Sequence, residues 1–228
     1  IFSGFEADEL LVLDIDASYE ERTIPFEFVK ALAYFTNVPL TVGGGISNLS
    51  QIRDLLSFGV ERIALSSKIS NNFKFLEKAA NQFGSSSISV IINLCLDNDD
   101  KKQKGYLGRP EINTPHSIDQ LAKDIQNAGA GELIINNIDK EGTKEGFDLE
   151  LIKRLNETLE IPLVALGGCG NLMHIEELLL NTPVSGVACA TLFVYGNEYN
   201  DVLLNYKPTS SWLKNKYPLF IDQWTQKK

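Results

Sequence analysis

The chain contains an internal repeat with a constant offset, and such a repeat is harder to obtain by chance than any single motif. The segment 8–16, DELLVLDID, matches the segment 131–139, GELIINNID, with 123 positions between partners. The glycine pair at 44–45 matches the glycine pair at 167–168 at the same offset. Self-similarity at a fixed period indicates a fold built from repeated supersecondary units. The chain is therefore predicted to consist of two similar halves.

Short aliphatic runs alternate with amphipathic stretches such as 24–36 and 148–159, which is typical of βαβ units around a buried parallel sheet. Seven strands are predicted, at 10–16, 39–43, 62–66, 88–94, 133–138, 162–166 and 186–191. The second copy starts with the strand 88–94, which has no counterpart in the first copy. The sequence thus favours an α/β fold, a (β/α)8 TIM barrel with half-barrel duplication whose first βα unit would precede Ile1. A seven-stranded open sheet is the alternative, although its exposed edge would favour aggregation.

A single domain is predicted over 1–228, because chains of this length and 43% hydrophobic content commonly form one α/β barrel. The half-barrel repeats would cover about 1–84 and 85–206, followed by a helical tail at about 207–228. The net charge of −9, without a basic cluster, argues against nucleic acid or an anionic membrane as a partner. No apolar run approaches the roughly 18 residues that span a bilayer.

The three cysteines, Cys95, Cys169 and Cys189, lie inside apolar runs and form no C-x-x-C pair. Neither a disulfide framework nor a zinc site is predicted from this pattern, which is typical of a reducing cytoplasm. His116 and His174 have no metal-binding spacing, and the helical pattern around His174 favours a structural role. No metal or cofactor is predicted. The acidic and lysine-rich segment 97–104 is interpreted as a solvated loop.

Two glycine-rich corners follow matched strands of the two halves, Gly44 and Gly45 in the first, Gly167 and Gly168 in the second. Ligands of α/β barrels bind at the carboxyl ends of the strands, and glycine lets the backbone N–H groups approach an anion. Hydroxyl or small residues follow the neighbouring strands: Ser66 and Ser67, Ala190 and Thr191. The two corners predict a ligand with two phosphates. The alternative is that these glycines only make tight turns.

Acidic residues at the same strand ends are candidates for proton transfer. Asp14 and Asp16 end the first predicted strand, and alternation along a strand would place both carboxylates on one side. Such a pair could act in general acid/base catalysis. Asp139 and Glu141 end the matching strand, where an ordinary loop with a helix cap is an equal alternative.

Taken together, these motifs resemble the cyclase subunit of imidazole glycerol phosphate synthase. The resemblance covers residues 6 to 193 and rests on DELLVLDIDAS, PLTVGGGI, FGVERIALSS, FGSSSISVIIN, GAGELIINNIDKEGTKEGFDLELI, IPLVALGGCG and CATLF. It implies a half-barrel-duplicated (β/α)8 lyase of histidine biosynthesis. Such a protein takes ammonia from a glutaminase subunit through the barrel and uses it on a small-molecule substrate with two phosphates.

Carried over to this sequence, the resemblance implies the following site residues. One phosphate site would comprise Gly44, Gly45, Ser66 and Ser67. The other would comprise Glu141, Gly142, Gly167, Gly168, Ala190 and Thr191. The ammonia entrance would be ringed by Glu9, Arg62 and Glu132, with Arg62 where the family usually has lysine.

The catalytic position differs from the family pattern. The resemblance implies a pair of aspartates, one on the first strand, which would precede Ile1, and one on the fifth, where this sequence has Asn93. An amide does not exchange a proton at neutral pH as a carboxylate does. Asn93 and Asp14 are therefore the candidate catalytic positions. A phosphate-binding or channel scaffold without catalysis is the alternative from another functional class.

A second branch of the family is also similar. Its members work with a glutaminase and a sugar amidotransferase to install acetamidino groups on sugars of surface polysaccharides or glycans. The similarity rests on LDIDAS and on the tail LFVYGNEYNDVLLNYKPTSSW, which starts at Leu192. The tail aromatics Trp212, Tyr217, Phe220 and Trp224 could instead form a last helix that packs on the barrel.

Overall fold

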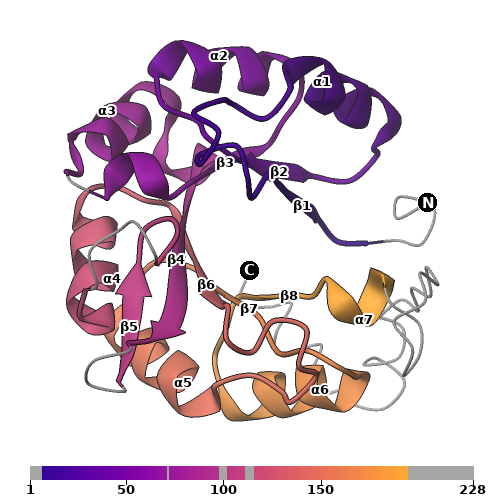
Figure 1. Ribbon diagram of the computed structural model, residues 1–228, viewed down its shortest axis with the longest axis vertical. Coiled ribbons are helices and arrows are strands. Elements are labelled where there is room, and N and C mark those ends of the chain that lie inside the picture. Colours follow the sequence, from indigo (N-terminus) through magenta and orange to yellow (C-terminus); the bar gives the residue numbers. More distant parts are fainter. Residues whose placement is uncertain (1–6, 71, 98–101, 111–115, 195–228) are drawn as a thin grey trace.

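The computed structural model describes residues 7–70, 72–97, 102–110 and 116–194. Seven parallel strands form one continuous path in the order β1-β2-β3-β4-β6-β7-β8, and β5 pairs antiparallel with β4. The strands curve around a common axis, as Figure 1 shows. They are β1 (Leu10–Leu13), β2 (Leu40–Gly43), β3 (Arg62–Leu65), β4 (Ile88–Leu96), β5 (Gln103–Tyr106), β6 (Glu132–Asn137), β7 (Leu163–Leu166) and β8 (Gly186–Ala188). The predicted α/β TIM-barrel class is confirmed.

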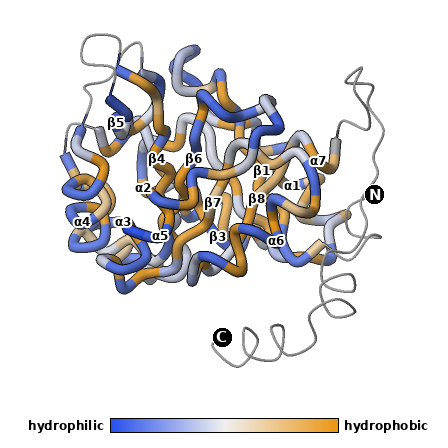
Figure 2. Tube along the Cα trace, turned by 90° about the horizontal axis from the view of Figure 1, so that it is seen from below, coloured by the Kyte–Doolittle hydropathy of each residue, from blue (hydrophilic) through white to orange (hydrophobic). Residues whose placement is uncertain are grey.

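Helices cover the outside of the curved sheet (Figure 1). They are α1 (Phe26–Phe35), α2 (Leu49–Ser57), α3 (Lys74–Phe83), α4 (Ile118–Asn127), α5 (Leu149–Thr158), α6 (Leu172–Asn181) and α7 (Thr191–Val194), with 3-10 turns at Ser67–Ile69 and Ser85–Ser87. One face of each amphipathic helix packs against outward-facing strand residues; for example, Leu55 of α2 and Ile63 of β3 are both fully buried in one large cluster. Figure 2 shows hydrophobic segments along the central strands and hydrophilic segments on the covering helices.

Three predictions about strands need correction. The first strand ends at Leu13 and the last at Ala188, so the polar residues predicted to end them, Asp16 and Thr191, lie beyond the sheet. The segment interpreted as a solvated loop runs into β5, which starts at Gln103 and pairs with an extension of β4 to Leu96. Its sequence, QKGY, lacks the apolar alternation by which strands are recognised, and pairing with β4 stabilises it.

The path of parallel strands ends at β1 on one side and at β8 on the other within the described residues. A strand between them would be the counterpart of 88–94 that the repeat predicts. The aromatic tail at 207–228 lies outside the described residues. Across the described ranges, no helix combines the length and apolarity that crossing a bilayer requires.

The barrel interior has its own, smaller apolar cluster, separate from the layer between strands and helices. Ala64, Ile91 and Ile134 are buried there. Leu11, Leu13, Val164 and Leu166 pack against them. These seven residues are called the apolar belt below. Every second side chain of a strand points inward. The inward residue before the belt on each strand therefore lies nearer the amino end of the barrel, and the one after the belt lies nearer the carboxyl end.

The duplicated halves also share a helix cap. Asn48 and Asn171, 123 positions apart, precede α2 and α6, and each accepts backbone N–H groups with its Oδ1. Three residues later, Gln51 accepts the Ser47 N–H at 2.8 Å, and His174 accepts the Gly170 N–H with Nδ1 at 3.2 Å. The histidine thus occupies the place of the glutamine in a capping box.

This equivalence predicts different outcomes for two substitutions of His174. His174→Gln should change the free energy of unfolding little, because glutamine makes the same contact in the first half. His174→Ala should lower it by about 1 kcal/mol, a usual value for a lost cap. Urea denaturation followed by circular dichroism measures both. Equal destabilisation by the two variants would contradict a capping role.

Candidate functional site

The two glycine corners adopt backbone conformations that favour glycine. Gly45 has a φ of 60° and Gly168 a φ of 100°. A Cβ atom at Gly45 would lie 1.8 Å from the carbonyl oxygen of Arg22, and one at Gly168 would lie 2.2 Å from that of Gly146. The loop after β1 therefore crosses directly over the first glycine pair, and the loop after β6 crosses over the second. This close approach explains the need for glycine, and binding of phosphate by the same backbone stays a prediction.

The predicted residues of the second phosphate corner come together. Gly167 lies against the backbone of Asn137, since a Cβ there would be 2.4 Å from the Asn137 carbonyl oxygen. Thr191, at the start of α7, donates its hydroxyl to Glu141 Oε1 at 3.2 Å. Loops that follow β6, β7 and β8 are thereby joined. Ala190 directly precedes Thr191, and Gly142 has open space around its Cα.

In the first corner, the Ser66 hydroxyl is already engaged. It donates to the Ile91 carbonyl oxygen at 2.8 Å and accepts the Gly108 N–H at 2.8 Å. Ser67 begins the 3-10 turn after β3. A phosphate at this corner would thus rely on backbone N–H groups and on Ser67.

Asp14 and Asp16 bind different arginines. Because β1 ends at Leu13, strand alternation does not extend to them. Asp14 accepts hydrogen bonds from Arg22, and this arginine lowers the pKa of the Asp14 carboxyl despite opposing desolvation. Asp16 pairs with Arg109 at 2.5 Å. Asp14 is therefore held as a carboxylate, which suits charge pairing better than donation of a proton.

The side chain of Asn93 belongs to a hydrogen-bond network across the barrel mouth. Its Nδ2 donates to the Gly108 carbonyl oxygen at 2.7 Å, and its Oδ1 accepts from Asn136 Nδ2 at 2.8 Å. With Ser66 bound to the Gly108 N–H, both polar groups of the Gly108 backbone are held. Asn136 Oδ1 is buried and accepts no hydrogen bond from the described residues. An unpaired buried acceptor costs about 1–3 kcal/mol.

Residues 107–110, called the strap below, extend this network to the opposite side. Arg109 donates to the Ile15 carbonyl oxygen at 3.2 Å and pairs with Asp16, both in the loop after β1. Its guanidinium carbon also lies 5.1 Å from the ring centroid of Tyr19. The strap was not predicted from the sequence. The dipeptide Gly108-Arg109 after a short polar strand is the only local signal for it.

The predicted charged ring lies at the amino ends of the strands. Arg62 starts β3, and Glu9 immediately precedes β1. The Arg62 Nη1 atom lies 2.9 Å from Glu9 Oε2. Glu132 starts β6 and accepts the Ser89 hydroxyl at 2.7 Å. Partial burial opposes the charge of Arg62, but the carboxylates of Glu9 and Glu132 raise its pKa. These charges thus stabilise one another at one end of the barrel.

Three pairs of inward side chains connect the two ends along β4 and β6. Parallel register sets Ser89 opposite Glu132 and Asn93 opposite Asn136. Ile91 and Ile134 lie opposite each other between these pairs. From one end to the other, the interior is charged, apolar and then amide-lined.

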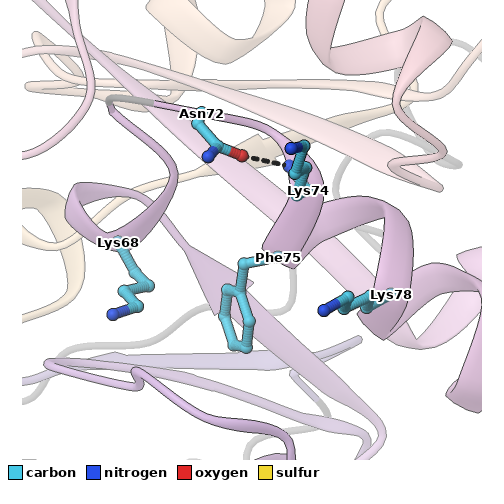
Figure 3. A pocket seen from close by; sticks show the side chains of 5 residues that line it. All are labelled: Lys68, Asn72, Lys74, Phe75 and Lys78. Carbon is cyan, nitrogen blue, oxygen red and sulfur yellow. Dashed lines mark hydrogen bonds between the residues drawn. The ribbon is translucent and has the colours of Figure 1, made fainter.

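A basic cavity of about 460 Å³ lies apart from these layers. Its lining side chains come from the turn after β3 and from the start of α3: Lys68, Asn72, Lys74, Phe75 and Lys78. In Figure 3, Lys68 and Lys78 lie on either side of the Phe75 ring. Lys68 follows Ser67, but none of the predicted phosphate residues lines the cavity.

Cys169 and Cys189 follow neighbouring strands at the second corner. A hydrogen bond with Cys169, together with burial, raises the pKa of Cys189 well above its usual range. The Cys189 thiol therefore stays protonated, and a protonated thiol is a poor nucleophile.

The fold and these layers define a class: α/β barrels with duplicated halves, glycine corners at the carboxyl ends of the strands and a charged ring at the amino ends. Residues 1–200 match the model of the family described as histidine biosynthesis protein. The chain therefore belongs to this family, among the HisF-like cyclase subunits of imidazole glycerol phosphate synthase.

Two relatives illustrate the similarity. A protein of Leptospira borgpetersenii, named putative imidazole glycerol phosphate synthase subunit HisF, is 38% identical over 206 residues, which cover 90% of this chain and 81% of the relative. The imidazole glycerol phosphate synthase subunit HisF of Clostridium botulinum strain Langeland is 35% identical over 216 residues, covering 92% of this chain and 81% of the relative.

The glycine geometry predicts a difference between Gly168→Ala and Gly142→Ala. Both residues have a positive φ, 100° and 80°, so both substitutions add backbone strain of about 1 kcal/mol. Only the methyl group at position 168 would also clash with a backbone oxygen. Gly168→Ala should therefore lower the free energy of unfolding by at least twice as much as Gly142→Ala in urea titrations. Similar losses of unfolding free energy in the two variants would contradict this prediction, because they would show that the loop around Gly146 moves away from the added methyl group at little cost.

The strap network predicts the effect of Asn93→Asp. A carboxylate oxygen would face the Gly108 carbonyl oxygen, where the amide now donates at 2.7 Å. We expect the strap to loosen and the Gly108 N–H to exchange at least tenfold faster with deuterium. The Gly105 N–H, bound to the His116 carbonyl oxygen at 3.0 Å, is the internal control and should keep its rate. An unchanged rate at Gly108 would mean that Asn93 does not hold the strap.

Proposed function

We propose that this chain is the ammonia-using subunit of an enzyme of the imidazole glycerol phosphate synthase type. It would receive ammonia from a glutaminase subunit and transfer it to a substrate that carries phosphate groups. The observation that carries the proposal is the layered interior: the Glu9–Arg62–Glu132 ring, then the apolar belt, then the Asn93–Asn136 amide pair.

The order of these layers suits the passage of neutral ammonia. The paired charges of the ring are exposed enough to face a partner, since the side chains of Arg62 and Glu9 are 28% and 35% accessible. Beyond them, the belt offers no polar group, so a charged ammonium ion would lose its hydration without compensation. Ammonia carries no charge and pays much less for this transfer. An interior that excludes water also keeps ammonia from being protonated before it reacts.

The carboxyl ends of the strands are the natural place for the substrate. Backbone N–H groups near the glycine corners and the starts of α2 and α6 offer partial positive charge to phosphates. The two corners belong to opposite halves of the barrel, so a substrate that binds both would extend across its mouth. Asn93 and Asn136 would then lie beneath it, between substrate and belt.

Asn93 favours a second candidate function. At this position the resemblance implies a catalytic aspartate, whereas Asn93 uses its amide to hold the strap and cannot serve as a general acid or base. Transfer of ammonia to an activated sugar, as in acetamidino-sugar formation with a sugar amidotransferase, would depend less on proton transfer at this position. A channel scaffold is the outcome expected if the barrel shows no turnover of its own.

The test compares two sources of ammonia in the complex of the full chain with its glutaminase. We expect turnover of the imidazole glycerol phosphate synthase substrate with ammonium chloride and with glutamine. Glutamine-dependent turnover alone should fall at least tenfold in Glu132→Lys, because the ring would hold a second cation beside Arg62 in place of a carboxylate. Glu77→Lys, the same charge change on the exposed face of α3, is the control.

Two outcomes would contradict this proposal. Equal loss with both ammonia sources in Glu132→Lys would argue against a route through the ring. If that variant does not fold, Glu132→Gln provides the same comparison with less disruption. Tight phosphate binding without turnover from either source would support the scaffold instead.

A further inference from the structure

A continuous chain of hydrogen bonds crosses the mouth of the barrel and ends on a single open acceptor. Ser66 donates to the Ile91 carbonyl oxygen and receives the Gly108 N–H. The Gly108 carbonyl oxygen accepts a hydrogen bond from Asn93 Nδ2 at 2.7 Å. Asn93 Oδ1 in turn accepts one from Asn136 Nδ2 at 2.8 Å. Every acceptor in this chain is filled until Asn136 Oδ1, which is buried and receives nothing from the described residues.

The chain also fixes which way both amide groups point. A carbonyl oxygen only accepts, so Gly108 requires the NH2 group of Asn93 to face it. Asn93 Oδ1 must then face Asn136, which requires the NH2 group of Asn136 on that side. Turning the Asn136 amide alone would place two oxygens 2.8 Å apart. The open acceptor is therefore imposed by the backbone of the strap.

The position of this acceptor relates it to the proposed route. On β6, Ile134 belongs to the apolar belt, and Asn136 is the next inward residue toward the carboxyl end. Glu132 is the preceding inward residue, at the ring. Asn136 Oδ1 is thus the first inward side-chain acceptor beyond the belt on β6, and it accepts no hydrogen bond from the described residues.

We infer that Asn136 Oδ1 binds ammonia at the end of the apolar belt. This inference rests on the proposed function, because it names the group that receives the ammonia. Ammonia has N–H donors and a lone pair, and an amide oxygen takes one N–H while leaving the lone pair free to attack. An amide oxygen also cannot protonate its guest, so the bound molecule stays nucleophilic.

The first test observes Asn136 directly. In protein labelled with 15N-asparagine, the side-chain amide signals of Asn136 should shift on addition of unlabelled ammonium chloride. The shift should be larger at pH 8.5 than at pH 6.5, since more ammonia is present at the higher pH. Potassium chloride at the same concentration should produce no shift. Signals that respond equally to both salts, or to neither, would overturn the inference.

The second test uses turnover with ammonium chloride. Asn136→Leu should raise the KM for ammonium about tenfold and leave the KM for the phosphorylated substrate within about twofold, the loss expected for one hydrogen bond. Asn156→Leu is the matched control, because its amide makes one bond, to the Ile152 carbonyl oxygen at 3.0 Å on α5. An unchanged KM for ammonium in Asn136→Leu would contradict the inference.

The two measurements separate this inference from the proposed function. Ammonium-dependent shifts at Asn136 without any turnover of wild type would support the ammonia site and contradict the proposed reaction. Turnover that is unaffected by Asn136→Leu would support the reaction and contradict the site. If Asn136→Leu does not fold, the shifts in the wild-type protein decide alone.

Discussion

The parallel register between β4 and β6 is the constraint on which the interior depends. It sets Ser89, Ile91 and Asn93 directly opposite Glu132, Ile134 and Asn136. Each pair is matched in chemistry: a hydroxyl donates to a carboxylate, two isoleucines pack together, and one amide donates to another. A slip of β6 by one residue against β4 would turn its three side chains to the other face of the sheet. The charged, apolar and amide layers therefore exist only in this register.

The duplication of the halves explains the scaffold better than it explains the chemistry. Both glycine corners are crossed by the preceding loop, and both following helices start with the same asparagine cap. The amide layer and the strap have no such symmetry, although Glu9 and Glu132 of the ring are repeat partners. Asn93 and Asn136 belong to neighbouring strands of the second half, while Ser66 belongs to the first. The two halves thus provide similar supports around a site whose polar groups are unevenly distributed.

Much of the fold could be predicted from the sequence, because β-branched and aliphatic runs mark buried parallel strands wherever they occur. The glycine corners were also visible, since the repeat shows them twice. The strap was missed for a physical reason: β5 is short and polar, and its order comes from contacts with distant residues. Arg109 reaches Asp16 over 93 positions, and Ser66 reaches Gly108 over 42. Likewise, the arginines that pair with Asp14 and Asp16 could not be predicted from spacing. Strand alternation ends at Leu13, so it does not say where these two carboxylates point.

Asn93 shows why the function of a substituted residue depends on its neighbours. Considered alone, it is an amide at a position where the family resemblance implies an aspartate, which suggests a lost proton donor. In the structure its NH2 group holds the Gly108 carbonyl oxygen and its Oδ1 accepts from Asn136, so a carboxylate could satisfy only the second contact. The change at position 93 is therefore coupled to the strap on one side and to the open acceptor of Asn136 on the other. If the barrel delivers ammonia as proposed, the amide layer would offer it an open acceptor in place of a proton donor.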